Sequence, residues 1–296
     1  MRTLIAATAA SLALAAAPAS ADNHKQMDHS KHAGMDHSKH DTAMFMKHHG
    51  EALSAAINHP SRAEDRARDQ YRHPAETLAF FHVAPHMTVG EYAPGGGWYS
   101  RLLGHYLGGE GKLVGIYANP LTATADEERR ERLRASAAGF GDEVAGYTGL
   151  TADNFSGITL ESISDEQRGS LDRILVIRGL HGITRSGIAD TEIRAMRELL
   201  KDDGMLGIVQ HRAKADAPFS YVDGSRGYLR QNDVIKFMEI NGFELVGTSE
   251  INANPMDTAD HERGVWEMPP VQATKRADLA DKGESDRMTL LFKKRP

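Results

Sequence analysis

The chain has 296 residues, contains no cysteine and carries a formal net charge of −6. The absence of cysteine excludes disulfides, thiolate metal sites and a cysteine nucleophile, and the negative charge gives no indication of a nucleic-acid partner. Apolar residues make up 40% of the chain and charged residues 26%, which is ordinary for a globular protein of enzyme size.

The first 21 residues have the pattern of a secretory signal peptide. Arg2 precedes an apolar run over residues 4–17, and Ala19-Ser20-Ala21 forms a small-residue cleavage pattern. The apolar run is shorter than the ~20 residues that a transmembrane helix needs, and we find no other candidate for a membrane span. We therefore predict a cleavable signal peptide and a periplasmic or secreted mature protein. A buried N-terminal helix is the alternative.

Residues 22–50 form a tract rich in histidine and methionine, in which the sequence MDHSKH occurs twice. The tract holds almost no aliphatic residue, so we predict that it is disordered when free. Imidazole and thioether groups are ligands that suit copper, and the tract resembles the Met/His-rich segments of exported copper-resistance proteins. A solvated linker that binds no metal is the alternative. The predicted metal ligands are Met27, His29, His32, Met35, His37 and His40.

Residues 51–296 have the composition of one folded domain. Residues 58–83 are predicted to be helical, with a break at Pro74. In the first of these helices Arg62, Asp65, Arg66 and Asp69 are spaced three or four residues apart, which favours ion pairs along an exposed helix surface.

Residues 87–118 predict a strand, a glycine turn, a helix and a second strand. The strand covers residues 87–93, the turn residues 94–97, the helix residues 98–107 and the second strand residues 112–118. Such a unit makes the two strands parallel, with a right-handed connection. A glycine turn at the carboxyl end of a strand lets a ligand approach the backbone, although a plain tight turn would have the same sequence.

Helices and strands continue to alternate along the rest of the chain. A buried strand precedes Arg178 and His181. An amphipathic helix then leads through a turn at Asp203-Gly204 to a strand that ends at His211, and the apolar residues of this helix are Ile193, Met196, Leu199 and Leu200. A further helix and strand follow over residues 231–250, and a closing strand lies near the C-terminus. This alternation predicts a doubly wound α/β sheet.

Several stretches resemble class I S-adenosylmethionine-dependent methyltransferases, and more narrowly a group of exported methyltransferase-like proteins. They include VGEYAPGGGWYSRLL, LKDDGMLGIV, INGFELV and SDRMTLLFKKRP, and the resemblance covers residues 60–296. It implies a mostly parallel, seven-stranded Rossmann-like sheet with its last strand antiparallel, N-terminal helices, and a cleft for S-adenosylmethionine above the glycine turn. The cofactor-binding residues expected from position are Glu91, Ala93, Gly95, Gly97, Tyr117, Asn119 and Arg178.

Two positions depart from the pattern of that family. Its cofactor loop reads acid-x-Gly-x-Gly-x-Gly, but Ala93 stands at the first glycine, where alanine is tolerated only at negative φ. The second strand of the family ends in an acidic residue that holds the ribose hydroxyls. Here Tyr117 takes that place, and Asn119 two residues later could hydrogen-bond a ribose hydroxyl instead.

Three residues at strand ends are candidates for catalysis. His211 or His181 could act as a general base toward the methyl acceptor, and Arg212 follows the same strand as His211. Each histidine could equally be a hydrogen-bonded structural residue. Two functions therefore remain open: a methyltransferase for a small-molecule or exported substrate with an accessory metal-binding tail, or a non-catalytic protein of this fold in periplasmic copper or metal binding or resistance.

Overall fold

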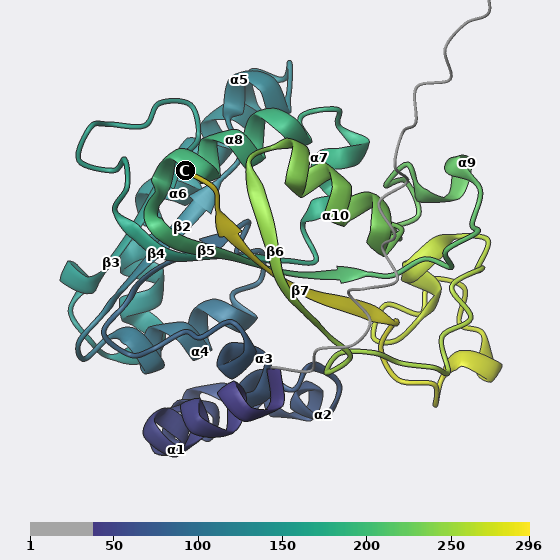
Figure 1. The fold of residues 1–296 in the computed structure, drawn as a ribbon, viewed down its shortest axis with the longest axis horizontal. Helices are drawn as coiled ribbons and strands as arrows, with labels where there is room; N and C mark the ends of the chain where they lie inside the picture. Colours follow the sequence, from purple (N-terminus) through teal and green to yellow (C-terminus); the bar gives the residue numbers. More distant parts are fainter. Residues whose placement is uncertain (1–37) are drawn as a thin grey trace, which may run out of the picture. The chain divides into compact units, whose positions relative to one another are not determined.

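The computed structural model describes residues 38–296, which form a seven-stranded sheet in the order β3-β2-β1-β4-β5-β7-β6 (Figure 1). β1 to β5 pair with one another in parallel, and β7 runs antiparallel to both of its neighbours, β5 and β6. The sheet confirms the predicted doubly wound, mostly parallel fold with an antiparallel last strand. The strands are β1 (Thr88–Tyr92), β2 (Lys112–Tyr117), β3 (Phe155–Thr159), β4 (Leu171–Ile177), β5 (Leu200–His211), β6 (Phe243–Ser249) and β7 (Arg287–Lys294).

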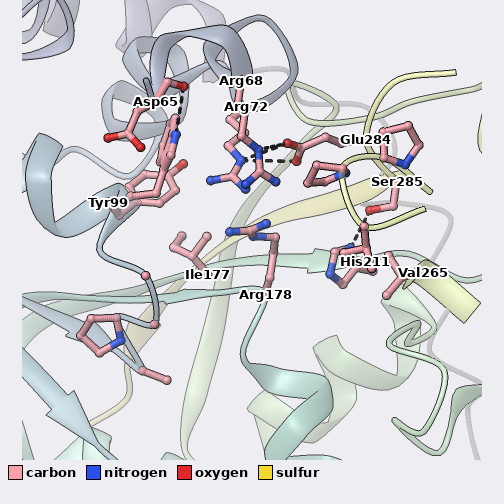
Figure 2. A pocket seen from close by; sticks show the side chains of 18 of the residues that line it. Asp65, Arg68, Arg72, Tyr99, Ile177, Arg178, His211, Val265, Glu284 and Ser285 are labelled. Carbon is pink, nitrogen blue, oxygen red and sulfur yellow. Dashed lines mark hydrogen bonds and ion pairs between the residues drawn. The ribbon is translucent and has the colours of Figure 1, made fainter. Parts of the chain in front are cut away.

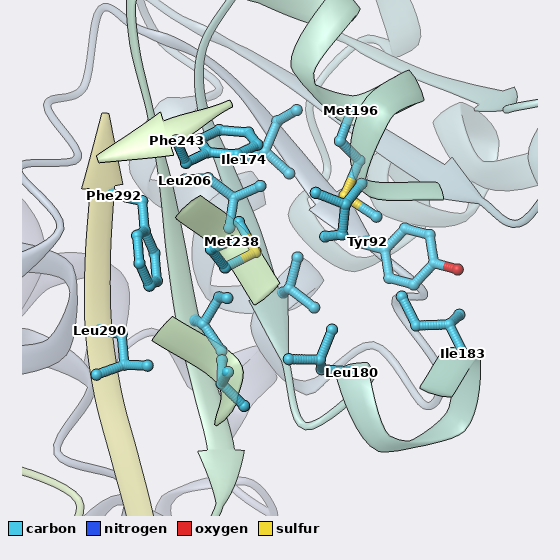
Figure 3. Close-up of a cluster of buried hydrophobic side chains, with 14 of the residues drawn as sticks. Tyr92, Ile174, Leu180, Ile183, Met196, Leu206, Met238, Phe243, Leu290 and Phe292 are labelled. Carbon is cyan, nitrogen blue, oxygen red and sulfur yellow. The ribbon is translucent and has the colours of Figure 1, made fainter. Parts of the chain in front are cut away.

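Helices cover both faces of the sheet. Side chains of α1 (Ser38–Ile57), α3 (Pro74–Phe80), α4 (Trp98–Leu107) and α6 (Glu127–Thr148) form one apolar cluster with one face of the sheet. Side chains of α7 (Leu180–Arg185), α8 (Ala189–Leu199) and α10 (Gln231–Ile240) form a second cluster with the other face (Figure 3). The single-turn helices are α2 (Asp69–Arg72), α5 (Pro120–Ala123) and α9 (Phe219–Val222). Within residues 38–296, no helix is long and apolar enough to cross a membrane.

Apolar spacing explains which side each helix buries. In α4, Leu102, Leu103, Tyr106 and Leu107 recur at helical spacing, and all four are buried. Burying a leucine side chain of this kind contributes about 1.5–3 kcal/mol, so this stripe fixes α4 against the sheet directly after the glycine turn. β5 starts at Leu200, immediately after α8, so the turn predicted at Asp203-Gly204 lies inside the strand.

α1 corrects the predicted extent of the disordered tract. The helix begins at Ser38, so the prediction of disorder was wrong for residues 38–50. Phe45 and Met46 pack against the same apolar cluster as Leu53 and Ala56, which gives the helix a buried side. The predicted signal peptide and residues 22–37 of the tract lie outside the described residues.

The segment before α3 also differs from its prediction. It consists of two 3₁₀ turns, Pro60–Arg62 and Arg66–Arg68, followed by α2, and not of one regular helix. Arg62 is fully buried and donates a 2.9 Å hydrogen bond to Asp69, while Asp65 accepts two hydrogen bonds from Arg101 of α4. Of the charges predicted to pair along a helix surface, Asp65 instead ties this segment to α4, whereas Arg62 and Asp69 pair within the segment.

Candidate functional site

A cavity of about 620 Å³ lies at the carboxyl ends of β1, β4 and β5 (Figure 2). The sheet order reverses between β1 and β4, and ligands of open α/β sheets bind at such a switch point. The walls come from residues 64–72, from the glycine turn at residues 93–96, from the end of β4, and from the long connection between β6 and β7, residues 250–286.

The glycine turn leaves its backbone open toward this cavity. A Cβ added to Gly96 would meet no atom within 4 Å, and one added to Gly95 would meet only the Ala93 carbonyl oxygen, at 3.8 Å. Gly97 lies against Arg101 and Tyr147, whose nearest atoms would be 3.1 Å from an added Cβ. The open stretch is therefore a cradle that any larger residue would fill.

Ala93 adopts a strained backbone conformation. Its φ is +51°, and Gly95 and Gly97 have φ values of +61° and +74°. The left-handed region costs an L-residue with a Cβ about 1–2 kcal/mol. The first position of the loop thus keeps the backbone geometry of a glycine although an alanine occupies it.

Glu91 lies beneath the turn and is buried. Its Oε2 accepts a 2.7 Å hydrogen bond from the Ser100 hydroxyl of α4. Burial raises the pKa of Glu91 to about 8, against the opposing effect of the Ser100 hydrogen bond and of Arg101. At neutral pH the group is therefore largely a neutral acid that ties β1 to the first turn of α4.

Tyr117 and Asn119, at the end of β2, do not line the cavity. The Tyr117 ring packs edge-on against Phe140, and the Asn119 side chain accepts a 2.9 Å hydrogen bond from the Leu121 amide, which caps α5. The backbone N–H of Asn119 donates a hydrogen bond to the buried carboxylate of Glu192, which also accepts a hydrogen bond from the Tyr92 hydroxyl. The structure thus gives Asn119 a local structural role, and the predicted ribose contact stays a prediction.

Arginines gather at the opposite wall. Arg178 follows β4 with a φ of +58° and lines the cavity together with Arg68 and Arg72 of the segment before α3. Glu284 accepts hydrogen bonds from Arg68 at 2.6 Å and from Arg72 at 3.3 Å. Arg287 donates to the same carboxylate at 3.0 Å. The cofactor role predicted for Arg178 is untested, but its position in the cavity agrees with a binding role.

His211 ends β5 and lines the cavity, whereas His181 lies behind it with ring centroids 5.7 Å apart. Nδ1 of His211 shares a 2.6 Å hydrogen bond with the Ser285 hydroxyl. Burial lowers the pKa of His211 well below its ordinary value, and His181 and nearby arginines lower it further. Burial also lowers the pKa of His181. Both rings are therefore neutral at pH 7, as a general base must be.

Arg212 does not line this cavity. It donates to Glu250 at 2.7 Å and to Asp286 at 2.8 Å, so it joins the β6–β7 connection to the end of β5. A catalytic role for it stays a prediction. Of the predicted metal ligands, Met27, His29, His32, Met35 and His37 lie outside the described residues, and the side chain of His40 is not described either. Residues 38–296 contain no group of three His, Cys, Asp or Glu side chains that could hold a metal ion.

The chain has a class I methyltransferase-like fold. No protein family and no curated protein matches it, but solved structures do. A SAM-dependent methyltransferase from Aquifex aeolicus is 15% identical, with a TM-score of 0.46 over 86% of this chain and 98% of the other. The 1,6-didemethyltoxoflavin-N1-methyltransferase of Burkholderia thailandensis, bound to S-adenosylhomocysteine, is 11% identical, with a TM-score of 0.45 over 87% and 90%. The [4+2]-cyclase SpnF is 15% identical, with a TM-score of 0.48 over 84% and 94%. These similarities concern the fold alone.

Sequence analysis missed Arg72, Glu284 and Trp266, which all line the cavity. Arg72 and Glu284 are 212 residues apart in the sequence and meet only in the folded chain. Trp266 lies in the connection between β6 and β7, where no strand or α-helix pattern marks it. One feature of the sequence could have indicated Glu284 and Ser285 as cavity residues. Both lie just before the closing strand β7, and the strand paired with it, β5, ends at His211.

Proposed function

We propose that this protein is an S-adenosylmethionine-dependent methyltransferase for a small-molecule or exported acceptor. The observation that carries the proposal is the open glycine turn, Ala93 to Gly96, facing a cavity at the switch point of the sheet. The fold is consistent with this activity but does not establish it, because one fold hosts many functions.

The residues around the turn fit the amino-acid end of the cofactor. Gly95 and Gly96 leave room for a ligand against the backbone, and the N-terminus of α4 gives this edge a partial positive charge. At the end of β2 the chain supplies Tyr117 and the capping residue Asn119 in place of an acid. The fit is therefore carried by the turn and by the walls of the cavity.

S-adenosylmethionine would supply a methyl group on a sulfonium that needs no further activation by the protein. The task of the chain is to align the acceptor with that methyl group. His211 is neutral, lies in the cavity and has its ring fixed by Ser285, so it can take the proton that the acceptor atom loses. Val265 and Trp266 line the same cavity and give the acceptor an apolar wall to pack against.

The test is calorimetric titration of S-adenosylmethionine into the metal-free mature chain and into two matched variants. Gly96→Val fills the cradle, whereas Gly109→Val adds the same side chain at a glycine that is equally free of neighbours but lies outside the cavity. We expect saturable one-to-one binding by the wild type and Gly109→Val, and loss of binding in Gly96→Val. Absence of binding by the wild type would favour the non-catalytic alternative, a protein of this fold in metal handling.

We also propose, from the sequence, that the protein is exported and that its N-terminal tract binds copper. Support comes from the signal-peptide pattern and from the repeated MDHSKH sequence. Mass analysis of the mature protein should place its N-terminus at Asp22, and an intact Met1 would contradict export. Deleting residues 22–37 should remove most copper binding and leave the thermal unfolding of the metal-free protein unchanged, and undiminished binding would contradict the tail as the site.

A further inference from the structure

Positive charge is in excess at one end of the cavity. Glu284 accepts hydrogen bonds from Arg68, Arg72 and Arg287. Arg178 lies near the same carboxylate: burial lowers the pKa of Arg178, and the charge of Glu284 opposes this with a smaller effect. Four guanidinium groups thus share one carboxylate. Buried charges in proteins are normally paired, so this group lacks negative charge.

Arg72 shows where that charge is missing. Its side chain is 1% exposed, and only its Nε donates to Glu284. Nη1 and Nη2 are buried and have no hydrogen-bond partner among residues 38–296. The guanidinium also lies over the Trp98 ring, 4.6 Å from its centroid, which holds the group in place without using its donors.

Arg178, directly after β4, faces Arg72 of α2, and the ends of the two side chains point toward one another (Figure 2). Nε of Arg178 is buried without a partner in the described part of the chain. Burial lowers the pKa of both arginines to about 10, so both remain charged at neutral pH. Two facing cations with unused planar donors match the geometry of a carboxylate or phosphate group.

We propose that the cavity binds an organic anion whose carboxylate or phosphate group lies between Arg72 and Arg178. Arg178 follows β4 and His211 ends β5, and these strands are neighbours in the sheet. The rest of such a molecule therefore extends toward His211 and the apolar wall at Val265 and Trp266. The anion is therefore the methyl acceptor, an assignment that rests on the proposed function. The binding site itself does not depend on it.

Inorganic phosphate is the first probe, titrated into the full mature chain at constant ionic strength with chloride as the background anion. Saturable one-to-one binding is expected, weakened about tenfold to 100-fold in Arg72→Gln and in Arg178→Gln. Arg66→Gln, in the same segment but exposed, is the matched control and should bind as the wild type does. Equal binding by wild type and Arg178→Gln would overturn the site.

Arg178→Gln keeps the test decisive if Arg72→Gln does not fold, because the Arg178 side chain makes no hydrogen bond within residues 38–296. A second titration separates two sources of the anion. If the acceptor supplies it, S-adenosylmethionine binds equally well with and without saturating phosphate. If the two compete, the site holds the carboxylate of the cofactor, and the acceptor assignment is wrong. Phosphate binding without any cofactor binding would support the anion site and refute the proposed methyl transfer.

Discussion

Replacing Glu284 by glutamine should destabilise the fold strongly. The substitution keeps the shape of the side chain but removes the carboxylate that hydrogen-bonds Arg68, Arg72 and Arg287 at 2.6–3.3 Å. Arg72 and Arg287 are 1% and 3% exposed, so both would become buried charges without a counterion. Breaking a buried ion pair from one side costs about 3–5 kcal/mol, and we expect a loss of that size in the free energy of unfolding.

Urea unfolding at pH 7, followed by circular dichroism, measures this loss. Asp278→Asn is the matched control, because Asp278 pairs with Arg276 at the surface, where water and salt screen the pair, and its loss should leave stability close to that of the wild type. Added phosphate should restore part of the stability of Glu284→Gln by supplying negative charge to the arginines. A loss below about 1 kcal/mol in Glu284→Gln would refute the argument that these arginines depend on one carboxylate.

The pH dependence of the same comparison is also fixed by the structure. Burial acts to raise the pKa of Glu284, but Arg287, Arg72 and Arg68 outweigh it, and the pKa is lowered from 4.5. A carboxyl group whose pKa is lowered in the folded state stabilises that state at pH values above its ordinary pKa. This contribution is lost as the pH falls through the pKa of the folded state. The difference between wild type and Glu284→Gln should therefore shrink below pH 4.5.

Two further predictions concern the glycine turn. Ala93→Gly should raise the free energy of unfolding by about 0.5–1 kcal/mol. The substitution relieves a backbone strain of about 1–2 kcal/mol, and this exceeds the cost of about 0.4–1 kcal/mol from the added freedom of the unfolded chain. A less stable variant in urea unfolding would contradict the φ of +51° at Ala93. Because the pKa of Glu91 is raised to about 8, its contribution to stability is present at low pH and is lost as the pH rises from 4.5 to about 8. Stability profiles of Glu91→Gln should be flatter across that interval, and parallel profiles for the two proteins would refute the raised pKa.

Strands next to glycines, including the edge strand β6, could be predicted from the sequence, and the edge strand β3 could not. β4 ends in a continuous apolar run, residues 174–177, because both of its faces are covered by helices. β3 was missed because it is a short edge strand in which only Phe155 is buried. α6 was missed for a related reason: its buried stripe, Ala137, Phe140, Gly141 and Val144, is narrow within a strongly charged helix.

The site residues that could be predicted are those at the ends of predicted strands. Residues that meet only through contacts between distant segments could not be predicted. The glycine turn and His211 stand at strand ends, and parallel strands bring such positions to one edge. The arginines of residues 60–72 have the spacing of surface ion pairs, and nothing local distinguishes Arg72, which is buried, from Arg66, which is exposed. What separates them is the position of Glu284, which the sequence does not place.

The bonds from Arg68 and Arg72 to Glu284 span 216 and 212 residues and so close almost the whole folded chain into a ring. Bringing such distant segments together has an entropic cost that is repaid only after the intervening sheet has formed. The cavity should therefore be among the last parts of the molecule to assemble. We therefore expect a chain truncated before Glu284 to lose the ligand site even where most of its secondary structure still forms.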